Sequence, residues 1–161
     1  MLYLEIRLLE PHEAGAVAAV MLESFSEYRA LYTQQGFAAT TPTTEQVLSR
    51  SQEGPVWVAV SEGKIVGTAS AVLKAEFLFV RGMAVLPAAR GRRVGESLLS
   101  ESERYATQHA CRRLVLSTTP FLERAIRLYE RFGFCHTEEG PHDLFGTPLF
   151  TMQKVLSNGS V

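Results

Sequence analysis

Residues 83–99 read MAVLPAARGRRVGESLL, and this stretch decides the fold. An apolar strand ends before Pro87, a short segment rich in glycine and arginine follows, and an amphipathic helix begins near Val94. The first amides of a helix have no intrahelical acceptor and lie at the positive end of the helix dipole. Glycine also lets the backbone approach an anion closely. The stretch therefore predicts a phosphate site, with an ordinary solvated helix start as the alternative.

Two common nucleotide-binding patterns do not occur in the sequence. It contains neither GxxxxGK followed by Ser or Thr, nor GxGxxG after the first expected strand. Neither a P-loop nor a dinucleotide-binding fold is therefore favoured.

Outward from this stretch, strand and helix patterns alternate along the chain. Strands are expected at residues 2–8, 56–60, 64–73, 77–85, 114–116, 134–137 and 147–156. The segment SEGK, residues 61–64, predicts a hairpin between the second and third of these strands. Helices are expected at residues 11–28, around Val47 and Leu48 after a cap at Thr43 or Thr44, at 94–109 and at 122–132. Residues 29–44 and the segment before Thr147 look irregular. This order predicts one α/β domain over residues 1–161, with a mixed, mostly antiparallel sheet of about seven strands and about four flanking helices.

Composition excludes several classes of protein. The 161 residues carry a net charge of −1, which gives no broad basic field for nucleic acid or an anionic membrane. No apolar run approaches the roughly 18 residues of a membrane span, so we expect a cytoplasmic protein. Cys111 and Cys135 lack CxxC spacing and indicate neither a zinc site nor a disulfide framework, so no metal is expected. Two buried thiols in a reducing compartment are the simplest interpretation.

The quoted stretch resembles motif A of the GNAT superfamily of N-acetyltransferases. That motif has an apolar strand and a proline, then Arg or Gln, two residues, Gly, one residue, Gly or Ala, and Leu-Leu. The segment AIRLYERFGF, residues 125–134, is similar to motif B of the same superfamily. Both motifs occur in the expected order, so the resemblance covers the whole chain. It implies a GNAT domain that uses acetyl-CoA.

The resemblance assigns roles residue by residue. It implies that the CoA pyrophosphate binds the segment Arg90, Gly91, Arg92, Arg93, Val94 and Gly95, and that the pantetheine arm pairs with the strand Met83, Ala84 and Val85. An amide near Met83 would polarise the thioester carbonyl, and Tyr129 would protonate the departing thiolate. The expected reaction is direct acetyl transfer to a primary amine in a ternary complex.

Three positions depart from the superfamily pattern. Arg93 replaces the middle glycine of motif A, and phosphate binding survives this unless the position requires a positive φ. Leu122 stands where many members have Asn, which removes a side-chain contact to the cofactor arm. Arg81 stands where some members have a Glu base on the central strand. A strand bulge is expected beside Gly82.

The acceptor side is less defined. Tyr28 and Tyr32 are expected to line the acceptor wall. Arg81 is expected either to bind an acceptor carboxylate or to form an ion pair with a neighbouring strand. Glu76, His142, Asp143 and a water chain all stay open as the base, with His142 bordering the cleft.

Other functions also stay open at this point. One alternative is an acyltransferase for a longer acyl-CoA; another is a non-catalytic CoA-binding sensor or partner-binding module. The resemblance implies a small-molecule or peptide amine as acceptor, and a homodimer is expected by analogy with the superfamily.

Overall fold

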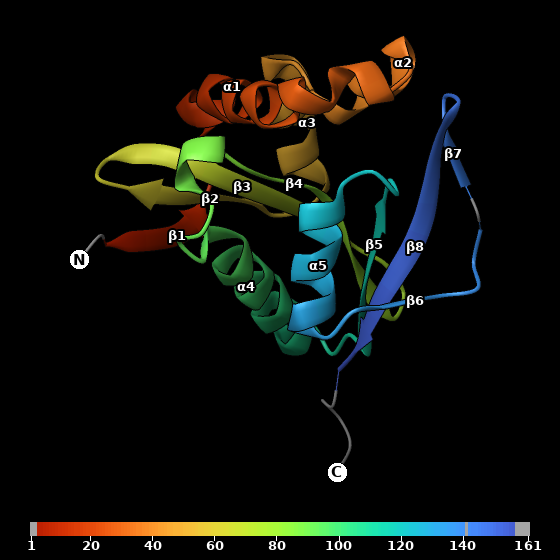
Figure 1. Cartoon of the computed structure of the whole chain (residues 1–161). Helices are drawn as coiled ribbons and strands as arrows, with labels where there is room; N and C mark the ends of the chain where they lie inside the picture. Colours follow the sequence, from red (N-terminus) through yellow and green to blue (C-terminus); the bar gives the residue numbers. More distant parts are fainter. Residues whose placement is uncertain (1–2, 141, 157–161) are drawn as a thin grey trace.

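The computed structural model describes residues 3–140 and 142–156, which form one sheet with helices on both faces (Figure 1). The strands are β1 (Leu4–Leu8), β2 (Val56–Ser61), β3 (Lys64–Leu73), β4 (Phe77–Val85), β5 (Arg113–Thr118), β6 (Cys135–His136), β7 (His142–Leu144) and β8 (Thr147–Val155). The α-helices are α1 (Ala14–Phe25), α2 (Gln34–Thr40), α3 (Thr44–Glu53), α4 (Val94–Gln108) and α5 (Glu123–Phe132). Short 3-10 turns are η1 (Pro11–Glu13), η2 (Ser26–Leu31) and η3 (Pro87–Ala89).

The sheet runs in the order β1-β2-β3-β4-β5-β8-β6, and β7 pairs with β8. Every neighbouring pair is antiparallel except β4 and β5, which are parallel. This confirms a mixed, mostly antiparallel sheet in an α/β fold.

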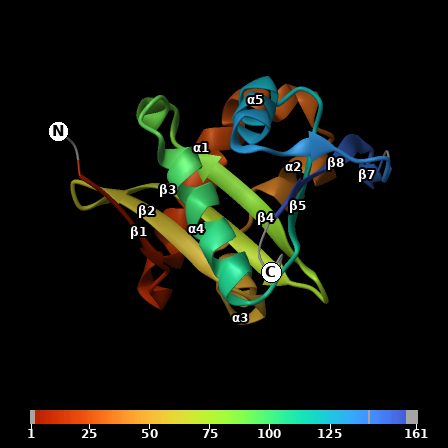
Figure 2. The same ribbon diagram turned by 90° about the horizontal axis from the view of Figure 1, so that it is seen from below.

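Helices cover the sheet in two layers. In Figure 1, α1, α2 and α3 lie above the sheet, and α4 and α5 lie below it. Figure 2 shows α4 running across the lower face of β2, β3 and β4. The core fills both interfaces, with Val17 and Val47 buried in the upper layer and Leu98 and Leu99 in the lower one. Segments far apart in the sequence thus enclose β4 on both faces.

The structure contains one strand and one α-helix more than the sequence indicated. The strand is β7, which lies in the segment expected to be a loop. Phe145 and Gly146 join it to β8 with φ of 50° and 93°, as a tight hairpin turn requires. The helix is α2, which Thr33 caps by accepting a hydrogen bond from the Gly36 amide (2.9 Å).

Several local predictions are confirmed. Thr43 is the cap of α3, in a capping box with Gln46. The hairpin between β2 and β3 turns at Glu62 and Gly63, both with positive φ. The first helix is shorter than predicted, because α1 ends at Phe25 and the tighter turn η2 continues the chain past Tyr28. The first strand begins at Leu4, and Leu2 lies outside the described residues.

The two cysteines differ in environment. Cys111 is buried, as expected, but Cys135 is exposed because it lies on the two-residue edge strand β6. Among the described residues, no helix has both the length and the apolarity needed to cross a bilayer.

Candidate active site

The centre of the molecule is an opening between β4 and β5. The two strands pair only at Phe77↔Arg113, Leu78↔Leu114 and Phe79↔Val115, although β4 continues to Val85 and β5 to Thr118. On their outer edges both strands stay paired, β4 with β3 and β5 with β8. The inner edge of β4 after Phe79 therefore presents backbone donors and acceptors that no strand uses, as an extended ligand requires.

A bulge in β4 coincides with this divergence. The β3–β4 register passes from Ser70↔Arg81 to Ala69↔Met83, so Gly82 is the extra residue. Gly82 has φ of 71°, and a side chain there would lie 3.1 Å from Arg50 Nη1 and 3.2 Å from Met21 Cε. A glycine bulge adds twist and bends the strand. The bulge predicted at Gly82 is confirmed, and it lies where β4 leaves β5.

Beyond β4, the chain turns sharply into α4. Its first intrahelical hydrogen bond runs from Ser97 N to Arg93 O (3.0 Å). The amides of Val94, Gly95 and Glu96 therefore have no acceptor inside the helix. These amides and the dipole of a helix of 15 residues favour an anion at this end. The helix start therefore offers free amide donors at the position where the sequence predicts a phosphate site.

Arg93 has a left-handed backbone, with φ of 62° and ψ of 22°. The position thus requires the conformation for which glycine is the usual residue. Arg93 adopts it, and the amides that follow keep their places at the helix start. Its side chain is 84% exposed and lies 3.4 Å from Glu96.

The other two arginines of the turn differ from each other. Arg90 turns back toward the upper layer, where its Nη1 lies 2.6 Å from Glu27 Oε1 and its Nη2 donates to the Ser24 carbonyl. Its charge is therefore paired within the protein, and it ties the turn to α1 and η2. Arg92 is exposed and does not line the cavity described below.

Tyr129 lies on α5, on the lower side of the opening. It is 8% exposed and packs edge-on against Phe134, with ring centroids 5.8 Å apart. Burial raises the pKa of Tyr129 to about 12, so its hydroxyl keeps its proton at neutral pH. Tyr129 is therefore a hydrogen-bond donor facing the opening.

Gly95 sets how closely α4 and α5 approach. A side chain at Gly95 would lie 2.6 Å from Leu128 Cδ2, on the turn of α5 that carries Tyr129. Gly133 then ends α5 with φ of 112°, and the Phe134 amide donates to the Tyr129 carbonyl (2.9 Å). The two motifs of the sequence thus meet at one helix contact, which places Tyr129 beside the turn before α4.

All of these elements border one cavity of about 1090 Å³. Of the sequence-predicted site residues, it brings together Tyr28, Tyr32, Arg81, Met83, Ala84, Val85, Arg90, Gly91, Arg93, Val94, Gly95 and Tyr129, and it leaves out Arg92 and His142. A cavity of this size fits a large ligand.

The upper side of the cavity is aromatic. Tyr32 is buried and meets Phe121 edge-on at 4.9 Å between ring centroids, and Tyr28 lies 6.3 Å from the same ring. Burial raises the pKa of Tyr32, and the nearby hydroxyls of Thr40 and Thr119 oppose that shift. Thr118 Oγ1, on the diverging end of β5, is buried without a hydrogen-bond partner among the described residues. It offers a ligand one further polar contact.

Comparison of the sequence with known proteins identifies the family of this chain. The sequence model of the Acetyltransferase (GNAT) family matches residues 18–134. The chain belongs to the GNAT family of acetyltransferases. It is 30% identical over 139 residues to the uncharacterized N-acetyltransferase YjgM of Escherichia coli strain K12, covering 83% of each chain. It is 26% identical over 91 residues to the aminoglycoside N(6′)-acetyltransferase type 1 of Salmonella typhimurium, covering 51% of this chain and 63% of that one.

Solved structures show the same fold. The PaiA N-acetyltransferase of Thermoplasma acidophilum, in complex with coenzyme A, superposes with a TM-score of 0.81 at 19% identity. The match covers 96% of this chain and 99% of that one. The GNAT resemblance and fold class expected from residues 83–99 and 125–134 are thereby confirmed.

The three residues considered as the base, Glu76, His142 and Asp143, do not line the cavity. His142 is exposed on β7, and Asp143 accepts a hydrogen bond from the Gly146 amide (2.9 Å) in the β7–β8 turn. Glu76 is exposed and lies 3.6 Å from Arg113. The β7–β8 hairpin does border the cavity, but through Leu144 and Leu149. In the part of the chain that the structure describes, Glu96 is the one carboxylate in the lining, and no histidine lines the cavity.

Arg50 is one of several cavity residues that the sequence did not indicate. Arg50 on α3 lines the upper side and lies against Gly82. It follows the buried Val47 by three residues, which places both on one face of a helix. That spacing was the available signal.

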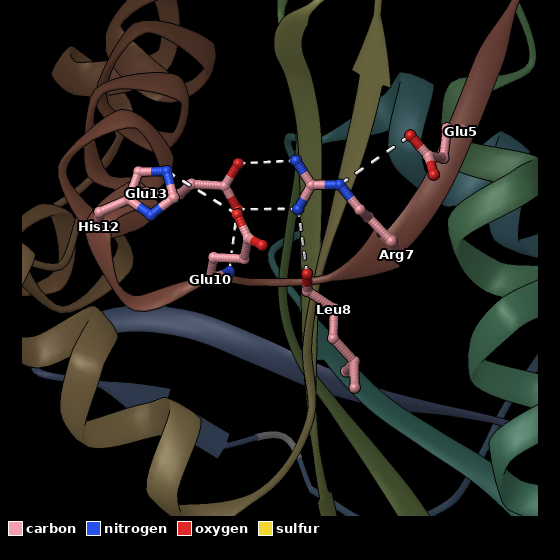
Figure 3. Close-up of polar contacts among 6 residues, drawn as sticks. All are labelled: Glu5, Arg7, Leu8, Glu10, His12 and Glu13. Atoms are coloured by element: carbon pink, nitrogen blue, oxygen red, sulfur yellow. Dashed lines mark hydrogen bonds and ion pairs between the residues drawn. The ribbon is translucent and has the colours of Figure 1, made fainter.

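A group of possible metal ligands lies elsewhere. Among the described residues, Glu10, His12 and Glu13 form the one group of His, Cys, Asp or Glu side chains close enough to share an ion. Figure 3 shows that both Glu13 oxygens already accept from Arg7, at 2.9 and 2.7 Å. An ion pair is the simpler account of this cluster, which does not line the cavity.

Proposed function

We propose that this acetyltransferase moves the acetyl group of acetyl-CoA to a primary amine by direct transfer in a ternary complex. The observation that carries the proposal is the opening between β4 and β5, with the α4 amides at one end and Tyr129 beside it. The pyrophosphate would bind the helix start, and the pantetheine arm would pair with the free edge of β4 at Met83–Val85. Catalysis then rests on positioning and on polarising the carbonyl.

In the proposed reaction, the amine nitrogen attacks the thioester carbon and the carbon–sulfur bond breaks. Tyr129 donates its hydroxyl proton in a hydrogen bond to the departing sulfur. Its pKa of about 12 exceeds the roughly 8.5 of an ordinary thiol, so this bond stabilises the thiolate without complete proton transfer. The proton of the amine passes to water, since the described lining residues include only Glu96 as a carboxylate, at the start of α4.

A Tyr129→Phe variant tests the role of Tyr129. We expect kcat to fall about a hundredfold because the developing thiolate loses its donor. The affinity for CoA, measured by calorimetry, should stay within about twofold, since the backbone holds most of the cofactor. Tyr105→Phe is the matched control, because Tyr105 packs on Trp57 outside the cavity. Equal turnover in Tyr129→Phe and the wild type would remove Tyr129 from the mechanism.

Further details belong to the same proposal. An aminoglycoside is the acceptor named for the Salmonella relative, and it is one amine to test here. Thiol release with acetyl-CoA and with longer acyl-CoA donors, over a library of amines, would settle the acyl chain length and the acceptor. A cytoplasmic location is part of the proposal and is tested by cell fractionation; the homodimer is tested by light scattering.

A further inference from the structure

Two arginines stand together on the upper side of the cavity. Arg81 directly precedes Gly82 in β4. Arg50 comes from α3, and its guanidinium group lies against Gly82. Their one acidic neighbour among the residues that the structure describes is Glu53, the last residue of α3, whose Oε1 lies 2.8 Å from Arg81 Nη1. Glu53 is half exposed and does not line the cavity. The group therefore carries one positive charge in excess.

Most of the donors of these guanidinium groups are unused. Arg81 Nε and Nη2 are buried and have no hydrogen-bond partner among the described residues. Arg50 donates from Nη2 to the Ala39 carbonyl over a long 3.4 Å. Buried donors without partners are rare in folded proteins and mark places where a group is missing. Burial lowers the pKa of Arg50, and the charge of Arg81 lowers it further. An anion would relieve both effects.

The upper side of the cavity has no carboxylate among the described residues to bind a cation. Within residues 3–140 and 142–156, the only carboxylate in the lining is Glu96, in the first turn of α4 below the sheet. Glu27, near the upper side, is engaged by Arg90. An acceptor with several positive charges would meet two arginines and no counter-charge there.

The phosphates of a nucleotide bound at α4 would not reach this group. Arg81 lies four residues before the end of β4 at Val85, about 13 Å along the strand. The side-chain direction at Gly82 points to Met21 of α1 and Arg50 of α3, in the upper layer. The arginines therefore belong to the acceptor side.

We propose that Arg50 and Arg81 bind a carboxylate of the acceptor, so that the acceptor is a small molecule carrying both a primary amine and a carboxylate. This inference rests on the proposed acetyl transfer. Arg81 precedes Met83 by two residues, about 7 Å along the strand. A carboxylate at Arg81 would place an amine a few bonds away beside the thioester carbonyl. An amino acid and a short peptide both have this chemistry.

The test compares matched ligands in a complex where no reaction occurs. Protein saturated with CoA is titrated with L-amino acids, dipeptides, their C-terminal amides and the corresponding decarboxylated amines. For each amino acid or dipeptide that binds, we expect a Kd at least about tenfold lower than that of its C-terminal amide. The reason is that an arginine–carboxylate contact is charge-assisted. Stronger binding of dipeptides than of amino acids would identify a peptide terminus as the source of the carboxylate.

Variants show whether the two arginines cause the preference. In Arg81→Gln and Arg50→Gln the difference between acid and amide should shrink to about twofold or less. Arg113→Gln is the matched control: Arg113 has a similar exposure, pairs with an exposed glutamate and lies outside the cavity. It should keep the preference. Thermal unfolding of each variant confirms that it is folded.

The inference and the proposed reaction fail separately. Equal binding of acid and amide to the wild type, tighter binding of an aminoglycoside than of any acid, or a preference that survives both substitutions would each overturn the carboxylate site. If the acids bind as expected but no thiol is released from acetyl-CoA, the carboxylate site stands and the acetyl transfer is wrong.

Discussion

At the scale of single residues, Arg93 shows how a site tolerates a departure from the usual sequence. The turn needs a left-handed residue before α4, and an arginine occupies that conformation here. A side chain in this region costs about 1 kcal/mol relative to glycine. In the proposed complex, the phosphate would face the set of amides that follows, and these do not depend on the side chain. The site can therefore keep its geometry at a modest cost in stability.

Replacing Arg93 with glycine should raise the free energy of unfolding by about 0.5–1 kcal/mol, since relief of strain exceeds the added entropy of the unfolded chain. Urea denaturation measures this change. Arg93→Ala is the control, because alanine loses the charge but keeps the strain, and it should not be stabilised. Both variants should bind CoA within about threefold of the wild type. A glycine variant less stable than the alanine variant would contradict the view that the backbone is strained at residue 93.

At the scale of elements, side-chain pairs fix segments that the sheet does not hold. Arg7 of β1 donates two hydrogen bonds to the Glu13 carboxylate, which also accepts one from the Glu10 amide (2.9 Å) (Figure 3). These contacts hold the 3-10 turn η1 against the edge strand just before α1 begins. They lower the pKa of Glu13 from 4.5 to about 2, chiefly through the hydrogen bonds from Arg7. The link between β1 and α1 is therefore sensitive to acid.

The pH dependence of this link has a defined sign. Because the folded pKa of Glu13 is depressed, the contact stabilises the protein above about pH 4.5 and is lost as the pH falls toward 2. Glu13→Gln should lower the free energy of unfolding by about 1 kcal/mol at pH 7. This deficit should shrink in acid. Denaturation at several pH values checks the prediction, with the exposed Glu10→Gln as control. A deficit that stays constant down to pH 2.5 would contradict it.

At the scale of the whole molecule, the cavity lies where the two halves of the sheet, β1 to β4 and β5 to β8, are joined by only a short stretch of strand pairing. β4 and β5 share three register positions, and the upper and lower helices meet the opening from opposite faces (Figure 1). A ligand that pairs with β4 and binds the start of α4 would connect these parts. Its binding energy adds directly to the stability of the folded state.

CoA at a hundredfold excess over its Kd should raise Tm by about 5–10 °C, from about 2.7 kcal/mol of added stability in a chain of this size. Scanning calorimetry measures the shift. Pantetheine, which lacks the pyrophosphate, should shift Tm much less at the same concentration. Equal shifts for the two ligands would mean that the turn before α4 does not hold the phosphates.

Prediction from sequence succeeded where the signal is local. The strand before Pro87, the cap at Thr43, the hairpin at Glu62 and Gly63, and the glycine bulge in β4 all follow from short patterns. It failed for α2 and β7, which lie in segments with weak periodicity. Both are fixed by tertiary contacts: the Thr33 amide donates to Thr147 Oγ1 (3.0 Å), and the Thr33 hydroxyl donates to the Phe145 carbonyl (2.8 Å). No pattern in residues 29–44 indicates a partner more than a hundred residues away.

The sequence by itself determined the fold and the family and predicted the anion-binding turn, because residues 83–99 and 125–134 carry local backbone requirements that few other structures satisfy. Only the tertiary structure decided which side chains line the cavity together. Arg81 could equally have turned to a neighbouring strand, and nothing in the sequence joins it to Arg50, thirty-one residues earlier. The bulge at Gly82 and the position of α3 bring the two guanidinium groups to one wall. Packing between distant segments sets that direction, so it cannot be inferred from spacing along one strand.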